Sequence, residues 1–261
     1  MAPFAADTGD PRWMRRFHPA DPISAGAAVP RLVVLPHAGG SASFYRPFSA
    51  LLAPRLDVLT VQYPGRQDRL REPVIEDIAA YADGVRAALP TDGRPLALYG
   101  HSMGAVIAFE VARRLEADGA GPLALVVSGR RAPSVHREEN IHLRDDTGLL
   151  AEVRALSVTD GRLLSDDELV RMILPALRGD YTAIERYGGS YAALSAPVLA
   201  VTGDADPWVD VAQARAWDRH TRGAFRLEVL SGSHFFIVEH IARMAELVTG
   251  FTLDSFASAS A

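Results

Sequence analysis

One serine in this sequence has the neighbours that covalent chemistry requires: segment 100–104, GHSMG, places Ser102 between two glycines. The apolar run 96–99 precedes the segment and the amphipathic run 105–115 follows it, which predicts a strand before the serine and a helix after it. A serine in such a sharp turn takes a strained backbone conformation, and glycines two residues away on either side avoid steric collisions. Ser102 is therefore the candidate nucleophile, and the alternative is a turn with a structural role only.

The serine needs an acid partner, because a base must remove its proton and a carboxylate must fix the tautomer of that base. Hydrolases with this type of turn place the acid and then the histidine later in the chain. Asp206 follows the apolar run 198–201 and is the candidate acid, because it lies deep in its loop and Pro207 stiffens the turn. Asp204 is better placed to bond its own loop backbone, and the alternative for both residues is turn formation.

The candidate base is His234, which lies in a Gly/Ser turn directly after the strand-like run 226–230. This loop position and the chain order Ser, Asp, His both favour it. His240 is the alternative, but it falls inside the predicted helix 235–256 and is less able to reach Ser102.

Acyl transfer at a serine also needs backbone amides that stabilise the oxyanion. The strand-like run 32–35 leads into PHAGGS at 36–41, and we predict that the amides of Ala38 and Met103 form the donor pair. A phosphate-binding turn at Gly39 and Gly40 is disfavoured, because the sequence has neither GxGxxG nor GxxxxGK at a strand-to-helix junction. We interpret His37 as a structural residue of this loop.

Composition limits the remaining classes of function. The chain has 261 residues, of which 48% are hydrophobic, and we expect one domain over 29–254, with a flexible lead-in at 1–28 and a disordered tail at 255–261. The absence of cysteine excludes disulfides and thiolate chemistry. The net charge of −5 argues against nucleic-acid binding. Neither a membrane span nor a secretory signal is evident, so we expect a cytoplasmic protein without membrane contact.

Apolar runs and helical patterns alternate along the chain, which predicts an α/β fold with a mostly parallel central sheet flanked by helices. Active-site residues are then expected at the carboxyl ends of the strands. The strand-like runs are 31–35, 58–63, 96–99, 123–128, 198–201 and 226–230, and the helical patterns are 44–53, 75–89, 105–117, 211–220 and 235–256.

The alternation of strand-like runs and helical patterns is interrupted between 132 and 194, where helical patterns at 147–156 and 165–187 have no strand between them. We expect this insertion, about 136–190, to form a lid. Its second helix repeats apolar residues at helical spacing, which indicates packing or, alternatively, the lining of an acyl-chain channel. The apolar positions are Leu169, Met172, Ile173, Leu177, Tyr181 and Ile184, of which we select Met172, Ile173, Leu177 and Tyr181 as channel candidates.

Arginines cluster at two places in the chain. Arg66 lies in a loop with Arg69 and Arg71, and Arg130 and Arg131 follow the strand-like run that ends at 128. We consider Arg66, Arg130 and Arg131 as docking residues for an acidic partner. The alternative is an ordinary solvated face.

Seven short motifs occur in a fixed order along the chain: PHAGG at 36–40, YPGR at 63–66, GHSMG at 100–104, SGRRAP at 128–133, LPALRGDY at 174–181, GDADP at 203–207 and GSHFF at 232–236. As a set, from about residue 30 to about 250, the sequence resembles the type II thioesterases of polyketide and nonribosomal peptide biosynthesis. That resemblance implies the α/β-hydrolase fold with a helical lid. Matched by position, it assigns the nucleophile, acid and base to Ser102, Asp206 and His234.

The resemblance also implies an activity, namely hydrolysis of acyl groups from the phosphopantetheine arm of carrier proteins, in an editing role. The expected partners are acyl or peptidyl carrier protein domains that bind transiently, and we expect a monomer without a metal or other cofactor. The lid segment 156–161, LSVTDG, lacks the Gly-Gly-Thr-Pro of many relatives, so lid shape and chain-length preference stay open. The alternatives are an esterase or lipase acting on free esters, an acyltransferase, and a noncatalytic binding protein, which the intact set of three residues disfavours.

Overall fold

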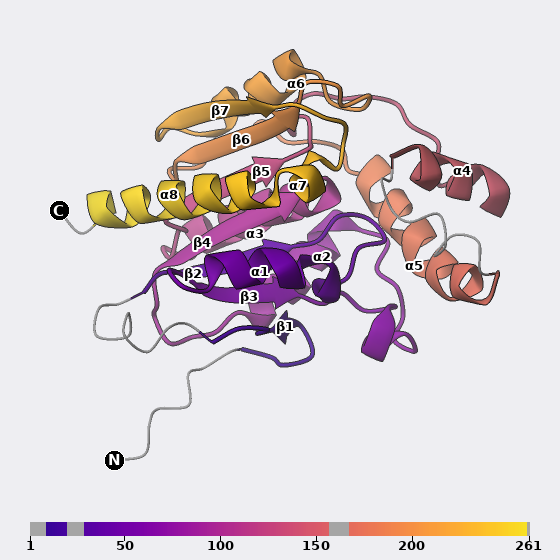
Figure 1. Cartoon of the computed structure of the whole chain (residues 1–261), viewed down its shortest axis with the longest axis horizontal. Coiled ribbons are helices and arrows are strands. Elements are labelled where there is room, and N and C mark those ends of the chain that lie inside the picture. Colours follow the sequence, from indigo (N-terminus) through magenta and orange to yellow (C-terminus); the bar gives the residue numbers. More distant parts are fainter. Residues whose placement is uncertain (1–8, 20–28, 157–166, 260–261) are drawn as a thin grey trace.

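A computed structural model of the protein describes residues 9–19, 29–156 and 167–259. Its centre is a seven-stranded sheet of order β1-β3-β2-β4-β5-β6-β7 (Figure 1). All neighbouring strands pair in parallel except β1, which runs antiparallel to β3. The strands are β1 Met14–Arg15, β2 Arg31–Leu35, β3 Asp57–Val61, β4 Leu96–His101, β5 Ala124–Ser128, β6 Val198–Gly203 and β7 Phe225–Leu230. The predicted α/β fold class is confirmed.

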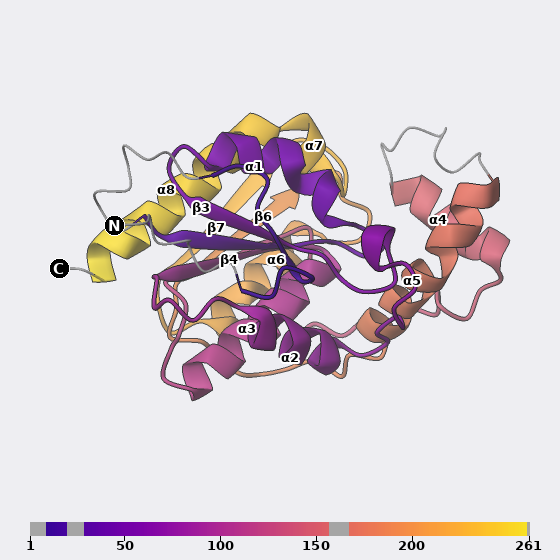
Figure 2. The ribbon, with the colours of Figure 1, turned by 90° about the horizontal axis from the view of Figure 1, so that it is seen from below.

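Helices cover both faces of the sheet, as Figure 2 shows. Helices α2 and α3 pack together on one face, and α1 and α8 pack together on the other. The helices are α1 Arg46–Leu52, α2 Ile78–Ala88, α3 Met103–Ala117, α4 Asp146–Leu156, α5 Asp167–Glu185, α6 Val211–Arg215, α7 Phe236–Glu239 and α8 Ile241–Ala259. Among the described residues, none of these helices is both long enough and apolar enough to cross a bilayer.

Strand β2 shows why the sheet is buried on both faces. Its side chains alternate, so that Val33 and Leu35 join the apolar cluster under α2 and α3, whereas Leu32 and Val34 join the cluster under α1 and α8. Every residue of β2 is buried. A continuous apolar run is therefore the expected sequence of this strand, since neither face meets water.

The lid lies beyond one end of the sheet, beside the carboxyl ends of the strands (Figure 1). It contains α4 and α5, close to the two helices expected from the sequence. Residues 157–161 of the atypical lid segment, and the side chain of Leu169, lie outside the part of the chain that is described.

The N-terminal segment differs from the flexible lead-in that we expected, because residues 9–19 contain β1. The Met14 side chain is buried in the main core, and the Gln62 amide donates a 2.7 Å hydrogen bond to the Trp13 carbonyl. The expected disordered tail also differs, since residues 255–259 continue α8. The single helix expected over 235–256 is broken at His240, between α7 and α8.

The buried position of Met14 makes a prediction about stability. Met14→Ala is expected to lower the free energy of unfolding by about 2 kcal/mol or more, because it removes apolar contacts and leaves a cavity. Arg12→Ala is the control, since its ion pair with Asp10 is exposed and screened by solvent, and we expect little change in the free energy of unfolding. Urea unfolding followed by circular dichroism measures both variants. Equal stability of Met14→Ala and the wild type would show that this segment is not docked in solution.

Candidate functional site

Ser102 lies in the tight turn between β4 and α3, with backbone angles φ 54° and ψ −119°. A Cβ on Gly100 would stand 2.1 Å from the Gly104 carbonyl oxygen, and a Cβ on Gly104 would stand 2.1 Å from the Leu35 carbonyl oxygen. Only glycine fits at these two positions, because real Cβ atoms do not approach backbone so closely. The turn therefore has the strained geometry that the GxSxG spacing predicts.

Three side chains from three loops form a hydrogen-bonded chain at the carboxyl edge of the sheet. The His234 Nε2 atom lies 3.0 Å from the Ser102 hydroxyl, and its Nδ1 atom lies 2.8 Å from Asp206 Oδ2. The side chains of His234 and Asp206 are buried. This geometry lets His234 accept the serine proton at Nε2 while Asp206 holds the proton at Nδ1.

Asp206 is fixed on both of its carboxylate oxygens. The Trp208 amide donates to Oδ1 at 2.9 Å, and His234 occupies Oδ2. Asp204 accepts instead from the Gly232 amide at 2.9 Å. Asp204 thus binds the neighbouring histidine loop, and not its own loop as the sequence suggested, and it holds the two loops together.

The alternative base, His240, is turned away from the serine. Its Nε2 atom lies 2.8 Å from the Ser231 carbonyl oxygen and 3.1 Å from the Ser231 hydroxyl, which places the ring against the start of the loop that carries His234. Of the two histidines that the sequence offered, the structure brings only His234 to Ser102.

Two further imidazoles lie near His234, and both stay neutral at pH 7. Burial, and next the charge of His234, lowers the pKa of His37 to about 3 and lowers the pKa of His101 well below its usual range. His37 bonds the Tyr45 hydroxyl at 2.9 Å and His101 bonds the Ser128 hydroxyl at 2.8 Å. Neither ring therefore adds a second positive charge when His234 takes up a proton.

The amides of Ala38 and Met103 are the predicted donors for an oxyanion. In the loop after β2, the Gly39 amide donates to Asp180 at 2.7 Å and the Gly40 amide donates to the His37 carbonyl at 2.9 Å. Within the described residues no acceptor is found for the Ala38 amide, nor for the amide of Met103, the first residue of α3. A helix N-terminus also favours negative charge. The oxyanion role of Ala38 and Met103 stays a prediction.

The four channel candidates of the lid divide into two pairs. Leu177 and Tyr181 are buried in a small apolar cluster that contacts Ala38 and Trp208, whereas Met172 and Ile173 are exposed. The Trp208 ring lies 6.4 Å from the Tyr181 ring and 6.4 Å from the His234 ring. Leu177 and Tyr181 therefore approach the candidate site, and the other two face solvent.

The arginines that we considered for docking do not form an exposed surface. Arg66 is buried and paired with Asp180 at 2.8 Å, and Arg131 is buried and paired with Glu139 at 2.8 Å. Arg130 is partly buried, and burial followed by the charge of Arg131 lowers the pKa of Arg130. The docking prediction is corrected for Arg66 and Arg131, since guanidinium groups already neutralised inside the protein cannot attract an acidic partner. Asp180, the partner of Arg66, was not predicted as a site residue from the sequence.

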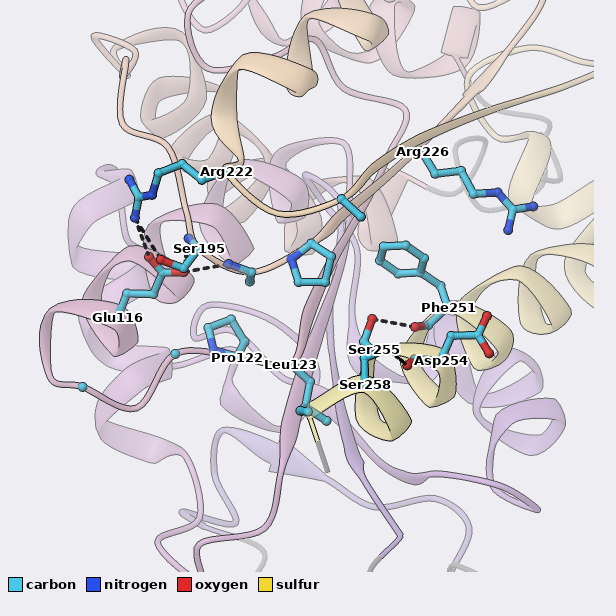
Figure 3. A pocket seen from close by; sticks show the side chains of 16 residues that line it. Glu116, Pro122, Leu123, Ser195, Arg222, Arg226, Phe251, Asp254, Ser255 and Ser258 are labelled. Atoms are coloured by element: carbon cyan, nitrogen blue, oxygen red, sulfur yellow. Dashed lines mark hydrogen bonds and ion pairs between the residues drawn. The ribbon is translucent and has the colours of Figure 1, made fainter. Parts of the chain in front are cut away.

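An open groove of about 1020 Å³ lies at the amino ends of the strands, opposite the end that carries Ser102 (Figure 3). Its walls include Leu123, Pro197 and Ala224, each directly before a strand. These positions mark the amino ends of β5, β6 and β7, so the groove is separate from Ser102. Among the described residues, no group of three or more His, Cys, Asp or Glu side chains is arranged to hold a metal ion.

Comparison with known proteins gives one consistent family. The sequence model of the thioesterase domain matches residues 30–251. A probable cadicidin biosynthesis thioesterase of Streptomyces griseus is 50% identical over 90% of this chain, which spans 64% of that relative's length. The structure of the type II thioesterase BorB from the borrelidin biosynthetic cluster is 46% identical, with a TM-score of 0.81 over 92% of this chain and 98% of that one. YbtT, a type II thioesterase from the yersiniabactin NRPS/PKS biosynthetic pathway, is 29% identical, with a TM-score of 0.82 over 94% and 99%.

The site geometry predicts different effects at the two histidines. His234→Ala is expected to slow labelling of Ser102 by a fluorophosphonate at least about 100-fold, because the hydroxyl loses its base. His240→Ala is expected to leave the labelling rate unchanged, since its ring bonds Ser231. Intact-protein mass spectrometry against time measures both rates. Fast labelling of His234→Ala would show that another group activates the serine.

Proposed function

The chain belongs to the thioesterase family, whose sequence model matches residues 30–251, and from that membership we propose that it hydrolyses acyl thioesters held on the phosphopantetheine arm of carrier proteins. The observation that carries the proposal is the relay of Ser102, His234 and Asp206, with contacts of 3.0 Å and 2.8 Å. The names of the relatives support a place in polyketide or nonribosomal peptide biosynthesis. There the enzyme would clear stalled or misprimed acyl chains.

The first half-reaction transfers the acyl group to the enzyme. His234 takes the proton of Ser102 at Nε2 as the serine oxygen attacks the thioester carbonyl carbon. The amides of Ala38 and Met103 stabilise the negative charge on the carbonyl oxygen. The carbon–sulfur bond then breaks, and the proton on His234 passes to the departing pantetheine sulfur.

The second half-reaction releases the acid. Water enters where the thiol has left, His234 takes its proton, and the resulting tetrahedral oxyanion forms against the same two amides. Collapse returns the proton to Ser102 and frees the carboxylic acid. The task of Asp206 is to orient His234 and to stabilise the imidazolium that forms twice in each cycle.

We propose that carrier proteins bind this enzyme transiently, because the acyl group moves to Ser102 and the unloaded carrier can dissociate before water attacks. We further propose that the enzyme acts as a monomer in the cytoplasm. Docking does not use Arg66 or Arg131, whose charges are neutralised inside the protein.

Removal of the nucleophile tests the covalent step. Ser102→Ala is expected to abolish acyl-enzyme formation and to lower kcat on an acyl carrier protein by at least about 1,000-fold, because the attacking oxygen is lost. Mass spectrometry of enzyme mixed with acyl carrier protein detects the intermediate, and thiol release measures turnover. Undiminished turnover by Ser102→Ala would exclude this mechanism.

A substrate comparison separates this proposal from hydrolysis of free esters and from acyl transfer. We expect a higher kcat/KM for an acyl group on carrier protein than for the same acyl group in a small oxygen ester, since the thioester carbonyl is more electrophilic and the carrier adds binding contacts. Chromatography of the products identifies the acceptor. Preference for the oxygen ester would favour an esterase, and transfer to an added alcohol or amine in place of water would favour an acyltransferase.

A further inference from the structure

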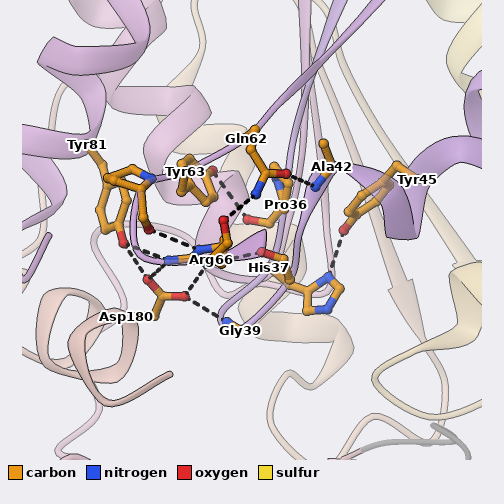
Figure 4. Close-up of polar contacts among 12 residues, drawn as sticks. Pro36, His37, Gly39, Ala42, Tyr45, Gln62, Tyr63, Arg66, Tyr81 and Asp180 are labelled. Carbon is orange, nitrogen blue, oxygen red and sulfur yellow. Dashed lines mark hydrogen bonds and ion pairs between the residues drawn. The ribbon is translucent and has the colours of Figure 1, made fainter. Parts of the chain in front are cut away.

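Asp180 is a fully buried carboxylate on the lid helix α5, and it reaches out of the lid into the loop that follows β2 (Figure 4). Its Oδ2 atom accepts from the Gly39 amide at 2.7 Å and from Arg66 at 2.8 Å. Its Oδ1 atom accepts from Arg66 at 2.9 Å and from the Tyr81 hydroxyl at 2.5 Å. Four hydrogen bonds thus fix this side chain in a single orientation.

Arg66 ties the same loop to the same carboxylate from the other side. Besides its two bonds to Asp180, its guanidinium donates to the Gly40 carbonyl at 3.0 Å and lies 5.2 Å from the centroid of the Tyr63 ring. Burial by itself would lower the pKa of Arg66, but the charge and hydrogen bonds of Asp180 outweigh burial and raise it. The two charges therefore neutralise each other, and Gly39 and Gly40 are both held by this ion pair.

The lid helix also touches the loop one turn before Asp180. Gly39 has φ +73°, and a Cβ at this position would stand 2.8 Å from Leu177 Cδ1. Because residues three apart lie on the same side of a helix, Leu177 and Asp180 form one contact surface. Helix α5 thus meets Gly39 through an apolar contact and through a charge-assisted hydrogen bond.

These contacts act directly next to the predicted oxyanion donor. The Gly39 N–H and the Ala38 carbonyl belong to one planar peptide unit, so a bond that anchors the Gly39 N–H also sets the rotation of Ala38 about ψ. The Ala38 N–H belongs to the preceding peptide unit, which is joined to this anchored unit through the Cα of Ala38 alone, so the anchor limits how far the Ala38 N–H can turn. Preorganisation of this kind matters, because oxyanion donors must not reorganise as charge develops.

We propose that Asp180 is a positioning residue for the proposed hydrolysis: from the lid it holds the Gly39 peptide unit and thereby aims the Ala38 amide at the oxyanion. The inference rests on the proposed function, because it assigns a task to the oxyanion loop of that site. In this arrangement the lid is part of the catalytic scaffold as well as a cover for it.

Asp180→Asn tests the inference, because the amide keeps the size of the carboxylate but loses its charge and one of its two acceptor atoms. We expect kcat on an acyl carrier protein to fall about 10- to 100-fold with little change in KM, as a misaimed donor weakens transition-state stabilisation. Two inhibitors separate this effect from a general disturbance of the site. An alkyl trifluoromethyl ketone forms a tetrahedral oxyanion with Ser102. A thioether with the same alkyl chain has no carbonyl group and forms none.

The ketone is expected to bind Asp180→Asn about 10- to 100-fold more weakly than wild type, in parallel with kcat, since both depend on the oxyanion donors. The thioether is expected to bind both proteins equally. The control is Glu185→Gln, on the same helix. Glu185 is also buried and accepts backbone amides, from Ile141 at 2.9 Å and His142 at 3.1 Å, but these lie in the lid. Glu185→Gln therefore weakens hydrogen bonds within the lid and leaves the contacts of Gly39 unchanged.

If Asp180→Asn does not fold, Arg66→Lys is tested instead, since it keeps the positive charge and loses the bidentate hydrogen bond to Asp180. We expect the same parallel loss of kcat and ketone affinity, of smaller size. Equal losses in Asp180→Asn and Glu185→Gln, or equal losses of ketone and thioether binding, would overturn the inference and leave Asp180 as a lid anchor. Failure of the proposed function is a separate result, because it would appear as a wild-type enzyme that does not turn over acyl carrier protein.

Discussion

The close approach of helix α3 to the end of strand β2 is the constraint on which the rest of the site depends. Gly104 comes so near the Leu35 carbonyl that no side chain fits between them. This contact places the first turn of α3, with Ser102 and the Met103 amide, beside the loop that carries Ala38. Oxyanion stabilisation requires donors that are held rigidly, so this close contact supports the predicted roles of the Ala38 and Met103 amides.

Charged and polar groups in this region are held as buried pairs. Asp180 pairs with the charged guanidinium of Arg66, and Asp206 bonds the imidazole of His234, which is charged only after it has taken up a proton. A buried ion pair contributes little to stability on balance, because its desolvation cost offsets much of its attraction. Its value here lies in orientation, since each carboxylate also accepts a backbone amide, of Trp208 or of Gly39.

Two predictions from the sequence were wrong, namely docking at Arg66 and Arg131 and a flexible N-terminal lead-in. Arg66 and Arg131 are functionally suggestive in sequence because arginines are usually exposed, yet each meets an acidic residue inside the protein. The N-terminal segment was expected to be a flexible lead-in, but the Met14 side chain packs in the core and β1 pairs with β3 at the edge of the sheet. In both cases the missing information was the identity of the group that the fold brings opposite.

The sequence by itself determined the parallel sheet, the turn at Ser102 and the chain order that selected His234 and Asp206, because strand and helix periodicity and GxSxG spacing are local properties. Tertiary structure alone decided that the Gly39 amide of the loop 38–40 bonds the lid, and that Asp204 bonds the histidine loop. It also decided that Asp180 reaches Gly39 across 141 positions of the chain. Hydrogen-bond partners so far apart are chosen by how loops and lid meet in space, and no local spacing encodes that choice.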